Sequence, residues 1–355
     1  MAERWLADTF RRLISATGPI SLMQFMGESN ARYYSREEVF GEEGDFITAP
    51  EISQMFGELI GLWLADLWIR AGRTEPVHYV ELGPGRGFLA RDAQRAMKRY
   101  GLEPRINLVE GSTRLRDIQL QQVPDAIFHH DLSAIAPDGP VLVVANEFLD
   151  ALPVRQLVMT GEGWREVMVD VAPDGENFCF VAGKQPMDSA VPEKRRKADV
   201  GTVIETCPGA AATMFEVAGR LVNQGGVALF IDYGYVEQRN GSTLQAIRNH
   251  QKLDPLSAPG EMDLTAHVDF EQMKQIALSR EAKWLGTTTQ GEWLTALGIH
   301  QRAEALSEFA PQYREALARA RDRLVLPDQM GDLFKVLALA DPDWPDAMGF
   351  VAKED

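Results

Sequence analysis

The sequence predicts an α/β protein built on a doubly wound parallel sheet. Apolar strand candidates alternate with amphipathic helix candidates from residue 77 onward. A glycine-rich turn over residues 83–87 lies between the first of these strands and the helix that follows. The run Val141–Ala145 is continuously apolar, as in parallel strands that are buried on both faces.

The expected elements follow one another along a single core domain. Strands are expected at residues 77–82, 105–110, 126–130, 141–145 and 227–232, and helices at 88–100, 113–122 and 208–223. A β-rich insertion at about residues 155–206 carries antiparallel strands at 155–160, 164–171, 178–182 and 203–206. Helical additions at about residues 240–330 make up the C-terminal part, with helices at 267–280, 291–297 and 302–323.

A helical N-terminal region precedes this domain. Thr48 and Glu51 have the spacing of a capping box, with Pro50 in the first helical turn, and an apolar-rich stretch follows over residues 55–69. We therefore expect residues 1–74 to pack as a helical extension on the core domain, which spans residues 75–355.

The composition excludes several classes of protein. The 355 residues include 36 basic and 52 acidic side chains, giving a formal net charge of −16. Such a chain repels phosphate backbones, so we expect no nucleic-acid partner. No apolar run reaches the roughly 18–20 residues that a membrane span needs. The two cysteines and six histidines show no metal-binding spacing, so we expect no metal.

The glycine turn indicates the cofactor. Its spacing is GxGxG, with Phe88 where the nicotinamide-binding fingerprint has its last glycine. Gly83, Gly85 and Gly87 allow positive φ and close approach of the backbone to a ligand. A turn of this form preceded by an acid, here Glu81, is typical of S-adenosyl-L-methionine sites. Glu81 hydrogen-bonds either the turn or the ammonium group of the ligand, and the sequence leaves both open.

Polar residues at strand ends complete the predicted cofactor site. Glu110 ends the second strand about 25 residues beyond the turn, where a carboxylate can accept both ribose hydroxyls. Asp131 ends the third strand, where an acid can accept the adenine amino group. Asn146, at the end of the fourth strand, is the remaining candidate. Taken alone, each acid could equally be an ordinary carboxylate at the end of a strand, with no contact to a cofactor.

Acids that follow the fourth strand are the candidate catalytic residues. Ligands of open α/β sheets gather at the carboxyl ends of the strands. A guanidinium group is always protonated in water, and carboxylates can hold it by bidentate hydrogen bonds. Glu147 is the first choice for this role and Asp150 the second, a loop with solvated acids being the alternative. His250 and His267 can assist proton removal near neutral pH, unless their roles are structural.

These blocks together resemble one family. The matching segments cover residues 44–51, 81–87, 146–154, 231–234, 241–250 and 260–270. They are similar to the MidA-like family, which includes the mitochondrial protein arginine methyltransferases needed for assembly of respiratory complex I. The resemblance implies a Rossmann-like class I methyltransferase sheet that uses S-adenosyl-L-methionine. It also implies symmetric dimethylation of an arginine in a subunit of the NADH:quinone oxidoreductase.

The leading hypothesis is thus a protein arginine methyltransferase with a protein substrate. A small-molecule methyltransferase is one alternative, and an assembly chaperone that binds the cofactor without turnover is another. The sequence leaves open whether the chain forms a homodimer. We expect a bacterial cytoplasmic protein, because the first 17 residues contain acids and lack the long apolar stretch of an export signal. The eukaryotic proteins that the chain resembles belong to the mitochondrial matrix.

Overall fold

The computed structural model describes residues 5–35, 48–248 and 251–350, which fall into two compact units. The sheet unit comprises Ile47–Leu149, Ala211–Val236 and Val268–Asp355, and the insertion unit comprises Met1–Phe46, Asp150–Ala210 and Glu237–His267. The chain thus leaves the sheet unit twice and returns twice. The predicted division at residue 74 does not coincide with these units, because residues 48–74 cluster with the sheet.

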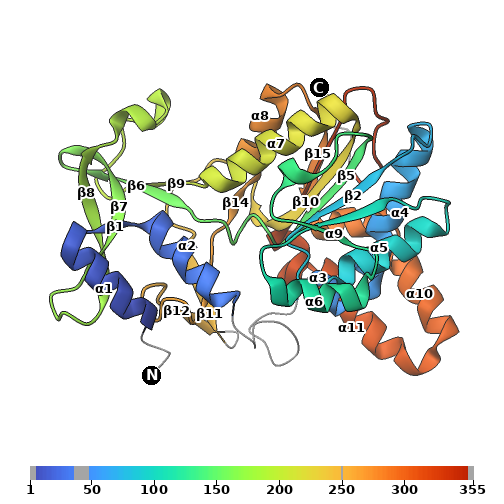
Figure 1. Cartoon of the computed structure of the whole chain (residues 1–355), viewed down its shortest axis with the longest axis horizontal. Helices are drawn as coiled ribbons and strands as arrows, with labels where there is room; N and C mark the ends of the chain where they lie inside the picture. The colour runs from blue at the N-terminus through green and yellow to red at the C-terminus, as the bar shows by residue number, and fades with distance from the viewer. Residues whose placement is uncertain (1–4, 36–47, 249–250, 351–355) are drawn as a thin grey trace. The chain divides into compact units, whose positions relative to one another are not determined.

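The sheet unit is built on one mixed sheet (Figure 1). The strand order is β15-β16-β10-β5-β2-β3-β4, and β14 pairs with β10. The strands are β2 (His78–Leu82), β3 (Arg105–Val109), β4 (Ile127–His129), β5 (Val141–Asn146), β10 (Gly226–Tyr235), β14 (Val268–Asp269), β15 (Lys283–Thr289) and β16 (Phe334–Ala340). Strands β4, β3, β2, β5 and β10 run parallel, and β16 is antiparallel to both β10 and β15. The predicted doubly wound α/β fold is confirmed.

Helices cover both faces of this sheet. Every residue of β2 and β5 is buried, and burial on both faces explains the continuous apolar run Val141–Ala145 in β5. One face shares a core with α4 (Gln54–Arg70), α5 (Phe88–Lys98), α9 (Gln290–Ala296), α10 (Ile299–Phe309) and α11 (Arg314–Val325). In Figure 1, α7 (Pro208–Gln224) and α8 (Phe270–Ser279) lie over the other face. The short helices α3 (Ala49–Ile52) and α6 (Thr113–Gln122) complete the unit.

The insertion unit combines two helices with two small sheets. The sheet β1-β7-β6-β9, to which β8 adds on β7, contains β1 (Ile20–Ser21), β6 (Arg155–Thr160), β7 (Gly163–Val171), β8 (Phe178–Pro186) and β9 (Val203–Thr206). The antiparallel strands expected at residues 155–206 are therefore present. The second sheet, β12-β11-β13, contains β11 (Gln245–Arg248), β12 (Gln251–Leu253) and β13 (Asp263–Thr265).

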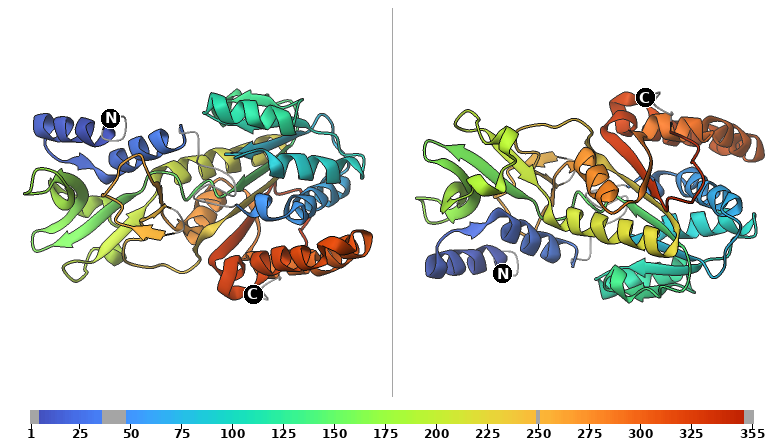
Figure 2. Two further views of the ribbon diagram at one scale, coloured as in Figure 1. Left: turned by 90° about the horizontal axis from the view of Figure 1, so that it is seen from below. Right: turned by 90° about the horizontal axis from the view of Figure 1, so that it is seen from above.

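Aromatic side chains form the core of the insertion unit. Figure 2 shows α1 (Trp5–Thr17) and α2 (Leu22–Tyr33) lying along the strands of this unit. Phe10 of α1 stacks on Phe25 of α2 with ring centroids 4.9 Å apart, and both rings meet the edge of Phe178 on β8. These three rings lie in the buried core of the unit, and aromatic pairs in such geometries add about 0.5–1.5 kcal/mol each beyond the burial of their area.

The C-terminal part departs from the predicted all-helical pattern. Strands β15 and β16 were not predicted, and neither were the three strands between residues 245 and 265. The helix expected at 302–323 is two helices, because Ala310 precedes Pro311 and takes a non-helical conformation (φ −134°, ψ 75°). The helix expected from residue 267 begins only at Phe270, where Asp269 caps it by accepting the N–H of Gln272. Within the described ranges, no helix is long and apolar enough to cross a membrane.

Candidate functional site

The glycine turn connects β2 to α5 and takes a left-handed backbone at three positions. The φ angles of Gly83, Gly85 and Gly87 are +62°, +52° and +82°, which glycine adopts without the penalty that a Cβ brings. A Cβ at Gly83 would lie 2.8 Å from the ring of Phe148, whereas a Cβ at Gly85 would have no atom of another described segment within 4 Å. The backbone at Gly85 therefore faces open space, where a ligand can approach it.

Glu81 lies buried beside this turn. The hydroxyl of Tyr79 donates a hydrogen bond of 2.6 Å to its carboxyl group. Burial raises the pKa of Glu81 to about 8, and the hydrogen bond from Tyr79 offsets only part of that shift. The carboxyl is thus largely protonated at neutral pH in the ligand-free protein. A cation placed beside it would restore its charge.

Gln119 joins the turn to Glu110, and the sequence analysis did not identify it. Its side-chain amide donates to the carbonyl of Gly85 at 2.7 Å and to Glu110 Oε2 at 3.3 Å. The other oxygen of Glu110 accepts the N–H of Ser112 at 2.8 Å, and burial raises the pKa of this carboxyl. No sequence motif marks Gln119, because its role depends on which side of α6 meets the turn.

Asp131 stands at the end of β4, as its position in the sequence predicted. It caps a short 3₁₀ helix (Leu132–Ala134) by accepting the backbone N–H of Ser133 at 2.8 Å, and it also accepts the hydroxyl of Ser133. These hydrogen bonds lower the pKa of Asp131, so the carboxylate is ionised at neutral pH. Its contact with adenine stays a prediction.

Glu147 leaves the end of β5 with a strained backbone. Its φ of +50° lies in the left-handed region, which costs a non-glycine residue on the order of 1–3 kcal/mol. Its Oε1 accepts the N–H of Ala49 and the side-chain amide of Asn146, both at 3.1 Å. Strain of this kind persists where the surrounding contacts hold it, and it clusters at functional sites.

The N-terminal end of α3 touches both the glycine turn and Glu147. Thr48 and Glu51 form the predicted capping box, which leaves the N–H of Ala49 directed at Glu147. Glu51 lies 3.6 Å from the guanidinium of Arg86 in the turn, and burial of this carboxyl raises its pKa. Three segments that are distant in sequence therefore meet around the carboxyl ends of β2 and β5.

Asp150 and His267 belong to the insertion unit. The carbonyl of Asp150 accepts the N–H of Ala266 at 3.0 Å, and the N–H of His267 donates to the hydroxyl of Thr243 at 2.8 Å. Asp150 is 4% exposed, and it raises the pKa of Tyr34, after burial and Asp263. The sequence analysis did not identify Tyr34, whose hydroxyl donates to Asp263 at 2.8 Å. His250 lies outside the described residues.

The residues of the sheet unit fit an adenosyl amino acid ligand. Two buried acceptors, Gln119 Oε1 and Asn146 Oδ1, have no hydrogen-bond partner among the described residues. Orphaned acceptors of this kind are costly unless a ligand or water donates to them. Together with the open backbone at Gly85, they suit the hydroxyl and ammonium donors of such a ligand. In the described ranges, no three His, Cys, Asp or Glu side chains are grouped to hold a metal ion.

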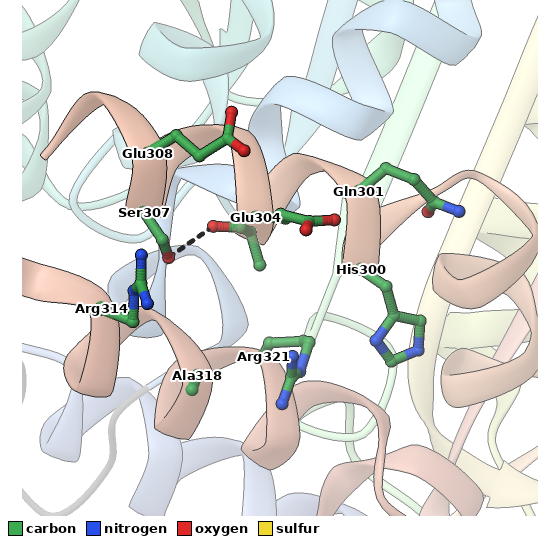
Figure 3. Close-up of a pocket in the computed structure, with 9 residues that line it drawn as sticks. His300, Gln301, Glu304, Ser307, Glu308, Arg314, Ala318 and Arg321 are labelled. Atoms are coloured by element: carbon green, nitrogen blue, oxygen red, sulfur yellow. Dashed lines mark hydrogen bonds between the residues drawn. The ribbon is translucent and has the colours of Figure 1, made fainter. Parts of the chain in front are cut away.

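A separate pocket of about 450 Å³ lies between α10 and α11 (Figure 3). His300, Glu304 and Ser307 of α10 line it from one side, and Arg314 and Arg321 of α11 from the other. The Ser307 hydroxyl is turned back onto its own helix, where it donates to the carbonyl of Ala303. None of the predicted site residues lines this pocket, so it is distinct from the site at the glycine turn.

Comparisons with known proteins agree with the cofactor inferred from this geometry. Residues 59–288 match the family described as "Putative S-adenosyl-L-methionine-dependent methyltransferase". The mitochondrial protein arginine methyltransferase NDUFAF7 of Rattus norvegicus is 35% identical, over 92% of this chain and 82% of its own. The human protein of the same name is 34% identical, over 95% of this chain and 84% of its own.

A solved structure extends this agreement to the fold. The crystal structure of a Burkholderia thailandensis protein bound to S-adenosyl-homocysteine is 29% identical, with a TM-score of 0.85 over 99% of this chain and 96% of that one. The predicted methyltransferase activity and S-adenosyl-L-methionine cofactor are confirmed. The chain belongs to this family of S-adenosyl-L-methionine-dependent methyltransferases, the MidA-like family that its motifs resemble.

Proposed function

We propose that the chain is a protein arginine N-methyltransferase in which Glu147 holds the guanidinium group of the substrate. The observation that carries this proposal is the strained backbone of Glu147 at the end of β5. Its carboxylate is anchored there through one oxygen by Ala49 and Asn146. The names of the NDUFAF7 relatives support arginine as the methyl acceptor.

In the proposed reaction the protein orients two groups for an in-line displacement. Bound S-adenosyl-L-methionine supplies an electrophilic methyl group on a sulfonium sulfur. Glu147 accepts N–H bonds of the guanidinium and draws positive charge away from the reacting nitrogen. A new N–C bond forms there, the methyl–sulfur bond breaks, and the nitrogen releases one proton. Asp150 is the second candidate for holding the guanidinium, and His250 and His267 are the proposed groups that assist removal of the proton.

The proposed cofactor contacts lie in the sheet unit. Gly83, Gly85 and Gly87 bring the backbone against the amino acid moiety, and Glu81 balances its ammonium charge. Glu110 accepts the ribose hydroxyls, and Asp131 accepts the adenine amino group. Asn146 contributes its buried Oδ1, which has no partner among the described residues.

Replacing Glu147 by Gln tests the central role. The change keeps the shape and an acceptor oxygen but removes the charge, so S-adenosyl-homocysteine affinity should stay within about twofold by calorimetry. Methyl transfer should fall on the order of 10²–10³-fold, as when one stabilising group is removed from an active site. Glu103→Gln is the matched control, since Glu103 is exposed and pairs only with Lys98 in the described structure. Unchanged transfer by Glu147→Gln would remove Glu147 from the reaction.

Labelled S-adenosyl-L-methionine and a lysate of cells that lack the protein identify the acceptor. We expect label in a protein band that mass spectrometry maps to a symmetrically dimethylated arginine, in a NADH:quinone oxidoreductase subunit as the family resemblance suggests. Label found only in small molecules contradicts a protein substrate. No label, together with intact partner assembly by Glu147→Gln, contradicts catalysis and fits a chaperone.

Substrate selection, oligomeric state and location are further parts of the proposal. We assign substrate selection to the insertion unit, where deletions should change the acceptor without abolishing cofactor binding. Light scattering of the purified protein tests whether it forms a homodimer, which the sequence leaves open. The relatives are mitochondrial, and fractionation of the native host tests the predicted bacterial cytoplasm.

A further inference from the structure

The loop that carries Glu147 is fastened to the neighbouring strand by one buried carboxylate. Asp232 lies on β10, which pairs in parallel with β5 so that Ile231 is opposite Asn146. Its side chain is 1% exposed. Oδ2 of Asp232 accepts the N–H of Phe148 at 3.2 Å and the N–H of Leu149 at 2.9 Å.

This carboxylate uses both of its oxygens on backbone N–H groups. Oδ1 of Asp232 accepts the N–H of Tyr233 at 2.9 Å, and the N–H of Glu147 donates to the carbonyl of Ile231 at 2.9 Å. The backbone from residue 147 to residue 149 is therefore anchored on β10 at every N–H. A charged acceptor makes such bonds stronger than a neutral one does.

These anchors account for the persistence of the strained conformation at Glu147. A left-handed non-glycine residue relaxes unless the atoms on both sides of it are held. Asn146 is held before Glu147 by the ladder between β5 and β10, and Phe148 and Leu149 are held after it by Asp232. The φ of +50° turns the Glu147 side chain to where Ala49 meets it.

We propose that Asp232 is a positioning residue for methyl transfer, which fixes the backbone so that the Glu147 carboxylate keeps its place against the substrate. This inference rests on the proposed function of Glu147. Asp232 itself acts through the backbone and not on the reacting atoms. Nothing in the sequence marks this role, since an acid at a strand end reads equally well as a ligand contact.

Replacing Asp232 by Asn gives the sharpest test, because the two side chains have the same shape. In one orientation the amide turns its NH₂ group to the N–H groups of Phe148 and Leu149, and in the other it turns it to the N–H of Tyr233 and leaves the loop a neutral acceptor in place of a charged one. The anchoring of the loop is weaker in both cases, while the packing stays. We expect kcat to fall about 100-fold, as a displacement of about 1 Å at an active site does. The unfolding midpoint should fall, because a buried donor is left without an acceptor. S-adenosyl-homocysteine affinity should change little in the folded variant, which separates positioning of Glu147 from a general structural role.

The double variant Asp232→Asn/Glu147→Gln decides whether Asp232 acts through Glu147. If it does, the double variant is about as slow as Glu147→Gln alone. If instead the fold-losses in kcat of the two single variants multiply in the double variant, the inference is overturned. Full activity of Asp232→Asn also overturns it. If Glu147→Gln alone is fully active, the proposed function fails instead, so the two failures are distinct.

A second variant guards against a loss of folding. Asp232→Glu keeps the charge and both acceptors but lengthens the side chain, which displaces the loop without removing its anchors. Circular dichroism and S-adenosyl-homocysteine binding establish that it is folded. We expect a reduced kcat and little change in KM, and wild-type kcat in the folded Asp232→Glu variant also overturns the inference.

Discussion

The hydroxyl of Tyr79 donates a 2.6 Å hydrogen bond to the carboxyl of Glu81, and the two side chains are buried two residues apart on one face of β2. Burial raises the pKa of Glu81 from 4.5 to about 8. The folded state therefore holds a proton that the unfolded chain has released over this range of pH. A buried acid of this kind makes folding depend on pH.

The stability that Glu81 contributes should decrease as the pH rises. It is complete below about pH 4.5 and is lost as the pH passes through about 8, because the folded state binds more protons between these values. The total effect is at most about 5 kcal/mol in the free energy of unfolding. Urea unfolding of the wild type and of Glu81→Gln from pH 5 to 8.5 measures it.

The side chain of the Glu81→Gln variant stays neutral. Its free energy of unfolding should therefore exceed that of the wild type by an amount that grows as the pH rises. Tyr79→Phe is a second check: it removes the hydrogen bond that lowers the pKa of Glu81, and the decline should move to higher pH. Parallel curves for the wild type and Glu81→Gln would contradict the assignment.

Cofactor binding should release a proton from Glu81. The positive charge of the amino acid moiety favours the charged carboxylate, so affinity for S-adenosyl-L-methionine should rise with pH up to about 8. Calorimetry in buffers of different ionisation enthalpy counts the released protons. Glu81→Gln is the control that isolates this group, since titration of the ligand itself persists in it. Equal proton release by both proteins would place Glu81 away from the ligand charge.

Replacing Gly85 by Val should abolish cofactor binding while sparing the fold. No described residue lies within 4 Å of the added Cβ, so the new side chain costs backbone strain on the order of 1–3 kcal/mol at this positive φ and occupies the ligand's approach. Gly101→Val is the matched control, because Gly101 also has a positive φ and open space around it. We expect over 100-fold weaker S-adenosyl-homocysteine binding for Gly85→Val only. Equal affinities of the two variants would disprove the site.

Removing the amide of Gln119 should loosen the turn. Gln119→Leu leaves the carbonyl of Gly85 without its donor and Glu110 with one fewer, which costs about 1–3 kcal/mol of stability. Affinity for S-adenosyl-homocysteine should fall roughly tenfold, since 1.4 kcal/mol corresponds to a factor of ten. Gln121→Leu, on the exposed part of α6, is the control. A Gln119→Leu protein with wild-type stability and affinity would show that the amide is dispensable.

Local patterns in the sequence were sufficient to predict the parallel core and the strand ends at which Glu110, Asp131 and Asn146 stand. Both predictions rest on local signals, the periodicity of the strands and the spacing of the glycines, each of which spans only a few residues. Gln119, Tyr34 and Asp232 could not be predicted, because their partners come from segments far away in the chain. Tertiary packing decides toward which segment a helix face or a strand-end carboxylate points, and a local pattern does not contain this.

The strands β15 and β16 were missed for a different reason. Residues 336–340 form a short apolar run that fits a buried strand or a helix equally well. Only its neighbours decide: β16 enters between β10 and β15, with Val227 opposite Ala340 and Tyr233 opposite Phe334. The helices expected from the sequence end at residue 323 and the helical additions at about residue 330, so no strand was assigned to residues 334–340.

The insertion of β16 between β10 and β15 sets an order on biosynthesis. Until residues 334–340 have left the ribosome, the edge of β10 from Val227 to Tyr233 has no strand to pair with on that side. Open apolar edges of this kind recruit other chains. The edge of β10 therefore stays unpaired while about a hundred further residues are synthesised. A chain that ends before residue 334, for example from a truncated mRNA, should be prone to aggregate.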